Sequence, residues 1–332
     1  MQIQNKVLLS VAVATPVLLV GAAVLAAGGT GLCALLAAGA TASFAGLQAF
    51  ILLEIRGSSR AVARALRTQS PRSNSARPAA AATWLEGMPI PPPALRFMGE
   101  DDAKFVDTAR ELTRQLSGAG MSDTATVLDI GSGYGRLAAG LLSESGFRGN
   151  YIGLDILPKH VAWCKQIITK HDNRFQFVHL DVLNERYNPS GTIPAGEIRF
   201  PVPDASIDTC SLFSVFTHMY RDAIEHYLEE IARALRHGGI AVTTWFLFDE
   251  DRLAAVTSEK AHYQLTHVLE DGARCMNLAE PLHVIGYEQS DLTRMAARAG
   301  LDVERVSRGQ WAGDQWESPE SNFQDLVVFR KP

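Results

Sequence analysis

Glycines and carboxylates at the ends of three apolar runs could together bind a nucleoside. The run 126–130 is followed by the loop Gly131-Ser132-Gly133-Tyr134-Gly135, and glycines let the backbone approach a ligand closely. Asp155 ends the next run, 22 residues after Gly133, where a carboxylate can accept both hydroxyls of a ribose. Asp181 ends the third run and could accept a hydrogen bond from an adenine amino group. In this order the three features fit a ligand that contains adenosine.

The form of the glycine loop bears on the charge of that ligand. A dinucleotide-binding loop reads GxGxxG and receives a pyrophosphate at a helix N-terminus. This loop reads GxGxG, with Arg136 where the third glycine would fall. Asp129, just before the loop, would repel a pyrophosphate but could attract a cationic ligand. An NAD-dependent oxidoreductase is therefore an alternative that the loop disfavours.

Strands that alternate with helices must position these residues. Short apolar or β-branched runs predict strands at 126–130, 151–155, 175–180, 207–213 and 240–248. Between the last two, apolar residues recur at helical spacing over 220–236, and His237-Gly238-Gly239 is expected to end that helix. Alternation of this kind predicts a parallel sheet with its ligand outside the carboxyl ends of the strands.

Five segments of the body match the motifs of one known superfamily. They are 127–135 (VLDIGSGYG), the acidic strand ends Asp155 and Asp181, the strand 208–213 (DTCSLF) and 235–239 (LRHGG). With these motifs, residues 95–330 resemble the class I S-adenosylmethionine-dependent methyltransferases. The segments 151–156, 161–164 and 214–218 further resemble bacterial methyltransferases found with glycan and secondary-metabolite pathways.

The resemblance implies an α/β fold and a set of cofactor contacts. The fold would be a Rossmann-like seven-stranded, mostly parallel sheet with helices on both faces. Its last hairpin would be reversed, with 301–306 and 323–329 as the final strands after a helix at 288–299. The implied contacts to S-adenosylmethionine divide by part of the cofactor. They are Gly131, Ser132 and Gly133 at the methionine part, Asp155 at the ribose, Asp181 and Val182 at the adenine, and Phe213 and Ser214 at the sulfonium, with Asp129 and Ile156 as further cofactor-binding residues.

Methyl transfer to a hydroxyl group would benefit from a base. The sulfonium supplies an electrophilic methyl group, so the protein chiefly holds the acceptor in line and excludes water. His218 lies just past the fourth strand, and its ordinary pKa of ~6.5 suits a base. It is the leading catalytic candidate; the alternative is that it caps a helix or holds a loop.

The other histidines indicate no metal site. His179 is expected to be a hydrogen-bonded histidine of the third strand. His262, His267 and His283 fall in the segment 249–286, an acceptor-binding insertion or lid, without close metal-ligand spacing. The segment 184–203, rich in proline, is expected to form a loop over the cleft.

The first 55 residues predict a membrane anchor. Residues 7–27 and 32–53 carry no charge, and ~20 apolar residues span a bilayer. A turn sequence at 28–31 separates them, so we predict a transmembrane helical hairpin over 1–55. A single span with a re-entrant second segment and a cleaved signal peptide are the alternatives. Lys6 and the arginines after residue 55 place both flanks, and hence the body, in the cytoplasm at the inner membrane.

Charge and proline content mark out the remaining organisation. Residues 1–80 carry seven basic residues and one acidic residue, whereas residues 81–332 carry a net charge of −11. An acidic body does not fit the backbone of nucleic acid, and a basic head fits anionic lipid. A basic, proline-rich linker is expected over 56–93 and the methyltransferase domain over 94–332.

The predicted function is a membrane-anchored methyltransferase that uses S-adenosylmethionine. Its acceptor would be an oxygen of a small-molecule, lipid-linked or glycan compound; no nucleic-acid partner and no metal are expected. The alternative from another class is a non-catalytic protein that binds S-adenosylmethionine and localises a partner at the membrane.

Overall fold

The computed structural model of this 332-residue chain describes residues 82–96, 100–144, 146–313 and 322–332. The predicted transmembrane hairpin over 1–55 and nearly all of the predicted linker lie outside these residues. Among the residues that are described, no helix is both long and apolar enough to cross a bilayer. The membrane anchor therefore stays a prediction.

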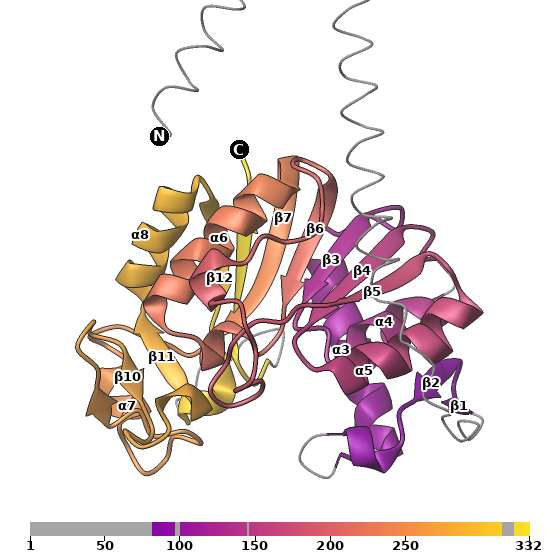
Figure 1. Ribbon diagram of the computed structural model, residues 1–332. Helices are drawn as coiled ribbons and strands as arrows, with labels where there is room; N and C mark the ends of the chain where they lie inside the picture. Colours follow the sequence, from indigo (N-terminus) through magenta and orange to yellow (C-terminus); the bar gives the residue numbers. More distant parts are fainter. Residues whose placement is uncertain (1–81, 97–99, 145, 314–321) are drawn as a thin grey trace, which may run out of the picture. The chain divides into compact units, whose positions relative to one another are not determined.

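A seven-stranded sheet forms the centre of the domain (Figure 1). Its strand order is β12-β13-β7-β6-β3-β4-β5. The five parallel strands are β3 (Thr126–Ile130), β4 (Asn150–Asp155), β5 (Phe175–His179), β6 (Ile207–Leu212) and β7 (Leu235–Trp245). The strand order reverses beside β3, which is where an open parallel sheet binds its ligand.

The last two strands form the expected reversed hairpin. β12 (Asp302–Ser307) and β13 (Asp325–Arg330) pair antiparallel, and β13 also runs antiparallel to β7. Both lie within two residues of the predicted strands. The Rossmann-like, mostly parallel sheet is therefore confirmed.

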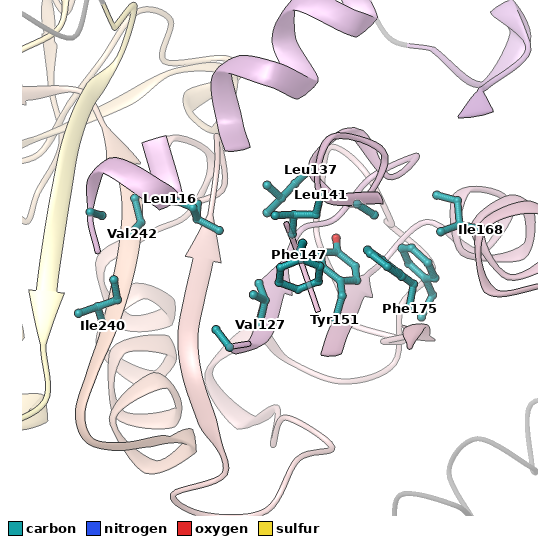
Figure 2. Close-up of a cluster of buried hydrophobic side chains, with 14 of the residues drawn as sticks. Leu116, Val127, Leu137, Leu141, Phe147, Tyr151, Ile168, Phe175, Ile240 and Val242 are labelled. Carbon is teal, nitrogen blue, oxygen red and sulfur yellow. The ribbon is translucent and has the colours of Figure 1, made fainter. Parts of the chain in front are cut away.

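Helices on one face of the sheet enclose the main apolar core. These are α3 (Asp102–Gly118), α4 (Arg136–Ser143), α5 (Pro158–Cys164) and its π-helical continuation η2 (Lys165–Thr169). Figure 2 shows Leu137 and Leu141 of α4 against Tyr151 and Phe175 of the sheet. The burial of such side chains stabilises the fold by ~25 cal/mol per Å² of apolar surface.

Two further helices lie apart from that group (Figure 1). They are α6 (Arg221–Ala234) and α8 (Gln289–Ala299), which pack against each other. α8 ends at Gly300, whose φ of +76° provides the left-handed cap. α6 ends at Ala234 rather than at residue 236, because Leu235 is already extended and pairs with Ile207 of β6. The expected cap at His237-Gly238-Gly239 is thus wrong, and these residues lie within β7.

Packed structure begins ahead of the predicted domain boundary at residue 93. β1 (Thr83–Leu85) and β2 (Met88–Ile90) form a hairpin, and η1 (Pro93–Leu95) follows it. Met88 and Ile90 are buried in a cluster with Phe105 of α3 and Tyr134 of the glycine loop. Apolar packing therefore connects this part of the predicted linker to the residues around the expected cofactor site.

Residues 247–288 form a second, smaller sheet of four strands, called the insertion below. Its elements are β8 (Leu247–Phe248), α7 (Leu253–Val256), β9 (His267–Val268), β10 (Arg274–Cys275), η5 (Pro281–His283) and β11 (Ile285–Glu288). In Figure 1 the insertion and the β1–β2 hairpin both lie at the end of the large sheet away from the C-terminus. β13 runs antiparallel to β7 and ends near the C-terminus. The parallel strands therefore finish at the opposite end of the sheet, beside the insertion and the β1–β2 hairpin.

A buried ion pair fastens the insertion to the large sheet. Arg252 and Asp325 lie 2.6 Å apart, with side chains 2% and 0% exposed. The Asp325 carboxylate also accepts hydrogen bonds from the backbone of Leu247 and Gly309 and from the indole of Trp311. Trp311 itself is fully buried.

Candidate functional site

Backbone conformation and crowding both require glycine at the start of the loop after β3. Gly131 has a φ of +78°, and a Cβ there would lie 2.4 Å from Val215 Cγ2. The amides of Gly131 and Ser132 both donate to the Leu154 carbonyl of β4. The loop is thereby fixed against the neighbouring strand, with no room for a side chain at its first position.

Gly133 presents bare backbone to open space. Its φ is +55°, and a Cβ at this position would have no neighbouring heavy atom within 4 Å. Its amide donates to Asp155 Oδ2 at 2.7 Å. The loop therefore offers a shallow backbone surface beside a carboxylate, which a ligand could approach as closely as glycine allows.

Asp155 links the glycine loop to the end of β4. Its second oxygen accepts a hydrogen bond from the Leu157 amide at 2.7 Å, and the residue is 7% exposed. Burial raises the pKa of this carboxyl to about 6, against the effect of the backbone amides that favour its ionised form. An ionised carboxylate offers about four acceptor positions, so capacity remains for ligand hydroxyls.

Asp129 lies under the loop rather than at its surface. Tyr151 donates to one carboxylate oxygen at 2.5 Å, and Ser211 donates to the other at 2.7 Å. The residue is 3% exposed, and burial raises its pKa to about 6. The structure thus joins Asp129 to β4 and β6 and does not bring it into the cavity described below.

The end of β5 divides into two environments. Val182 is buried and lines the cavity, whereas Asp181 does not line it. The Asp181 carboxylate accepts a hydrogen bond from Thr192 at 2.6 Å, and this contact lowers its pKa. The half-buried His179 of β5 contacts the Ile156 carbonyl at 3.1 Å, which agrees with a histidine that supports the fold.

Ser214, after β6, has an unusual backbone. Its φ is +57°, a left-handed value that costs a non-glycine residue ~1–2 kcal/mol. The Ser214 amide donates to the Thr244 hydroxyl at 2.7 Å, and its own hydroxyl donates to Gln324 at 3.0 Å. Strained residues of this kind persist where the surroundings fix them, and they concentrate at functional sites.

One cavity of about 610 Å³ brings most of the predicted residues together. Nine of the eleven predicted site residues line it. They are Gly131, Ser132, Gly133, Asp155, Ile156, Val182, Phe213, Ser214 and His218. The insertion contributes Tyr263, His283 and Val284, and the segment 184–203 contributes Asn184, Arg186 and Tyr187, so both predicted coverings border the cavity.

The geometry of His218 fits a neutral base. His218 Nδ1 lies 3.0 Å from the Leu282 carbonyl oxygen, which can only accept, so Nδ1 carries the proton and donates it. The other ring nitrogen, Nε2, is then unprotonated. Burial lowers the pKa of this imidazole, which favours its neutral form. The lone pair of Nε2 could therefore receive a proton from a bound hydroxyl.

Sequence reasoning missed a charged group beside the glycine loop. Tyr134 donates to Glu100 at 2.7 Å, and Arg136 pairs with the same carboxylate at 3.6 Å. All three line the cavity. The sequence shows the order of these residues but not their contact, because the packing of α3 brings Glu100 to the loop. No group of three His, Cys, Asp or Glu residues in the described ranges could hold a metal ion.

Comparisons with known proteins find similarity in the central part of the chain. Residues 127–239 match a family described as "Methyltransferase domain". A curated relative, the protein-lysine N-methyltransferase EFM4 of Saccharomyces cerevisiae, is 25% identical over 138 residues. The matched region is 41% of this chain and 57% of the yeast protein, so the chain spans little more than half of that relative.

Two solved structures are among those with a similar chain trace. One is the 1,6-didemethyltoxoflavin-N1-methyltransferase of Burkholderia thailandensis with S-adenosylhomocysteine bound, at 19% identity and a TM-score of 0.43 over 69% of this chain and 79% of that one. The other is a candidate sarcosine dimethylglycine methyltransferase from Galdieria sulphuraria, at 18% identity and a TM-score of 0.44 over 68% of this chain and 85% of that one.

Proposed function

We propose, from the match of residues 127–239 to a methyltransferase domain, that the chain transfers a methyl group from S-adenosylmethionine to an oxygen of a small or lipid-linked acceptor. The domain match agrees with the predicted enzyme class and with the predicted methyl donor. The acceptor and the membrane anchor are proposals. The observation that carries the proposal is that Gly133, Asp155 and His218 line the same cavity.

The residues around the glycine loop fit this cofactor. When bound, S-adenosylmethionine supplies an electrophilic methyl group on a positively charged sulfur. The open position at Gly133 allows close contact with the backbone, and the Asp155 carboxylate has capacity left for ribose hydroxyls. Glu100 and Arg136 provide an acidic and a basic group near the same loop, which suits a ligand that ends in an amino acid.

His218 would prepare the acceptor for attack. Its Nε2 takes the proton of the acceptor hydroxyl, and its Nδ1 stays bonded to the Leu282 carbonyl throughout. The walls of the cavity exclude water and hold the acceptor oxygen in line with the methyl group. General-base assistance of this kind typically contributes ~10²–10⁴-fold to the rate.

A membrane anchor would bring the domain to its acceptor. The uncharged segments 7–27 and 32–53 and the basic residues that follow support this part of the proposal. An enzyme held at the inner membrane meets lipid-linked compounds at high local concentration. Removal of residues 1–80 should then slow methylation of membrane-bound acceptors, and an unchanged rate would contradict the anchor's role.

Calorimetry and a transfer assay together test the function. The full chain, purified in detergent, should bind S-adenosylhomocysteine and transfer labelled methyl groups to at least one acceptor of a panel of alcohols, phenols, sugars and lysine peptides. Binding without transfer to any of them would favour the non-catalytic alternative. Binding of NAD in preference to S-adenosylhomocysteine would favour an oxidoreductase.

A further inference from the structure

The cavity has two halves of different chemistry. Gly133, Asp155 and Val182, from the ends of β3, β4 and β5, border the half that we assign to the cofactor. The other half lies around His218 and is bordered by the segment 184–203, by η4 (Phe216–His218) and by the insertion. We call it the acceptor half.

Aromatic and apolar side chains dominate the acceptor half. Tyr187 meets the ring of His218 edge-on, with ring centroids 5.6 Å apart. Phe246 and Tyr263 form a second edge-on pair at 5.3 Å, and both line the cavity. Met219 and Val284 complete these walls. Aromatic pairs add ~0.5–1.5 kcal/mol beyond the burial of their area, so such walls favour a ligand that is itself a ring.

The carbonyl oxygens of the two amide side chains that line the cavity, Asn184 and Gln324, already accept hydrogen bonds within the protein. The Asn184 carbonyl accepts hydrogen bonds from the amides of Arg186 and Tyr187, at 3.1 and 2.9 Å. The Gln324 carbonyl accepts from the Ser214 hydroxyl. A sugar has many hydroxyls, and each one that is buried without a partner costs ~1–3 kcal/mol. Arg186 and His283 remain as polar side chains that line the cavity, so the acceptor half suits a ligand with a few polar groups but far fewer than a sugar.

We propose that the acceptor is an aromatic hydroxyl compound, with its ring between Tyr187 and the Phe246–Tyr263 wall and its hydroxyl at His218 Nε2. This inference rests on the proposed function and deepens it, because it selects one class among the small, lipid-linked and glycan acceptors.

Proton transfer to His218 supports the same class. A phenol has a pKa of ~10, about four units above the usual value for imidazole, whereas the pKa of water is several units higher still. Aliphatic and sugar hydroxyls resemble water more closely than phenol in this respect. A neutral imidazole whose pKa is further lowered by burial is thus a far better match for a phenol.

The step balances with groups already named. The acceptor oxygen gives its proton to His218 Nε2 and forms a bond to the methyl carbon. The bond between that carbon and sulfur breaks, and its electron pair stays on sulfur. The products are an aryl methyl ether and S-adenosylhomocysteine, and the imidazolium then releases its proton to water.

Matched acceptors test the proposal on the full chain in detergent. With S-adenosylhomocysteine bound, calorimetry compares 4-hydroxybenzyl alcohol with 4-(hydroxymethyl)cyclohexanol, which has the same hydroxyls on a saturated ring. We expect the phenol to bind at least ~10-fold more tightly, consistent with one or two aromatic contacts. We also expect transfer to its phenolic oxygen alone. Phenols with and without a long alkyl tail then separate a free from a lipid-linked acceptor.

A second arm tests the base. His218→Gln should slow transfer to an ordinary phenol by ~10²–10⁴-fold, but transfer to 4-nitrophenol at alkaline pH, where it is already ionised, by less than ~10-fold. His267→Gln is the matched control, because His267 is exposed on β9 and does not line the cavity. It should behave as wild type with both acceptors.

The outcomes separate this inference from the proposed function. If S-adenosylhomocysteine binds but the phenol binds no better than its saturated counterpart, the inference is overturned. Preferred transfer to sugars, aliphatic alcohols or lysine peptides overturns it as well. If His218→Gln slows transfer to the ordinary phenol and to 4-nitrophenol equally, His218 is not the base. A chain that neither binds S-adenosylhomocysteine nor transfers methyl groups refutes the proposed function itself.

Discussion

Replacement of Asp155 by Asn separates ligand binding from fold stability at the end of β4. The substitution keeps the size of the side chain and removes its charge. In the structure, the two carboxylate oxygens accept hydrogen bonds from Gly133 and Leu157, both at 2.7 Å. If the ribose hydroxyls also donate to this carboxylate, the variant loses charge-assisted hydrogen bonds, which contribute ~1.5–3 kcal/mol. Affinity for S-adenosylhomocysteine should then fall by about 10- to 150-fold.

The same substitution should change stability much less. Burial raises the pKa of Asp155 from 3.8 to about 6, so the buried charge costs the folded state about 3 kcal/mol at neutral pH. Asn removes that cost. Its amide group then faces one of the two backbone N–H donors, and the donor left without a partner costs ~1–3 kcal/mol. Because the two effects oppose each other, the free energy of unfolding should stay close to the wild-type value.

Titration calorimetry and thermal unfolding measure the two quantities side by side. Asp107→Asn is the matched control, because Asp107 is exposed on α3 and lies outside the cavity. Wild-type affinity in Asp155→Asn would refute the ribose assignment. A large loss of stability together with the loss of affinity would instead mean that Asp155 acts mainly through the fold.

Three further predictions follow from the same geometry. Affinity for S-adenosylhomocysteine should rise as the pH rises through about 6, because the ionised form of Asp155 is the better acceptor for hydroxyl groups. Calorimetry below and above that pH measures the change, and an affinity that does not change would contradict this role of Asp155. Gly131→Ala should weaken the binding of S-adenosylhomocysteine, because φ is +78° and the new Cβ would lie 2.4 Å from Val215 Cγ2. Adding Val215→Ala to this variant should restore part of the affinity, and a double variant that binds no better than Gly131→Ala would refute the crowding argument. Arg252→Ala leaves the buried Asp325 carboxylate without its cation and should lower the free energy of unfolding by ~3–5 kcal/mol in denaturant titration, whereas a loss below ~1 kcal/mol would show that the ion pair does not secure the insertion.

The buried carboxyls also set the sign of the pH dependence of folding. The pKa values of Asp129 and Asp155 are both raised from 3.8 to about 6, so the folded chain holds more protons than the unfolded chain between these values. The contribution of these two groups to stability is therefore greatest at acidic pH and decreases as the pH rises through this window. Ligand binding and folding thus respond to pH in opposite directions at Asp155.

The sheet was predictable because its signals are local. Each parallel strand is a short apolar run, and Gly131, Asp155 and Asp181 follow directly from where three of those runs end. In a parallel sheet these ends must meet at one edge, so the strand ends alone indicate where the site lies. The final hairpin was expected from family resemblance, and β12 and β13 confirm it.

The sequence does not show which carboxylates at the strand ends face the cavity and which are covered by other side chains. Asp129 and Asp155 both end or nearly end a strand beside the glycine loop. Asp155 faces the cavity, but Asp129 is covered by Tyr151 and Ser211 from the neighbouring strands. That difference depends on which side chains pack across the sheet. Residues 83–90 likewise fall in the predicted linker, because an eight-residue hairpin among prolines has no periodicity long enough to indicate strands.

The features of the site that the sequence does not indicate depend on contacts between residues far apart in the chain. Glu100 lies 34 residues before Tyr134 and reaches it through the position of α3. His218 was selected by its place after the fourth strand, yet its tautomer depends on the Leu282 carbonyl, which lies 64 residues further on in the insertion. Neither pairing has a pattern that sequence alone could indicate.

A crystal structure of the domain with S-adenosylhomocysteine tests the central claim most directly. We expect the ribose hydroxyls at Asp155, the ligand close to Gly133, and the sulfur directed toward the half of the cavity that contains His218. Electron density for the ligand at any other place in the protein, with this cavity empty, would contradict it.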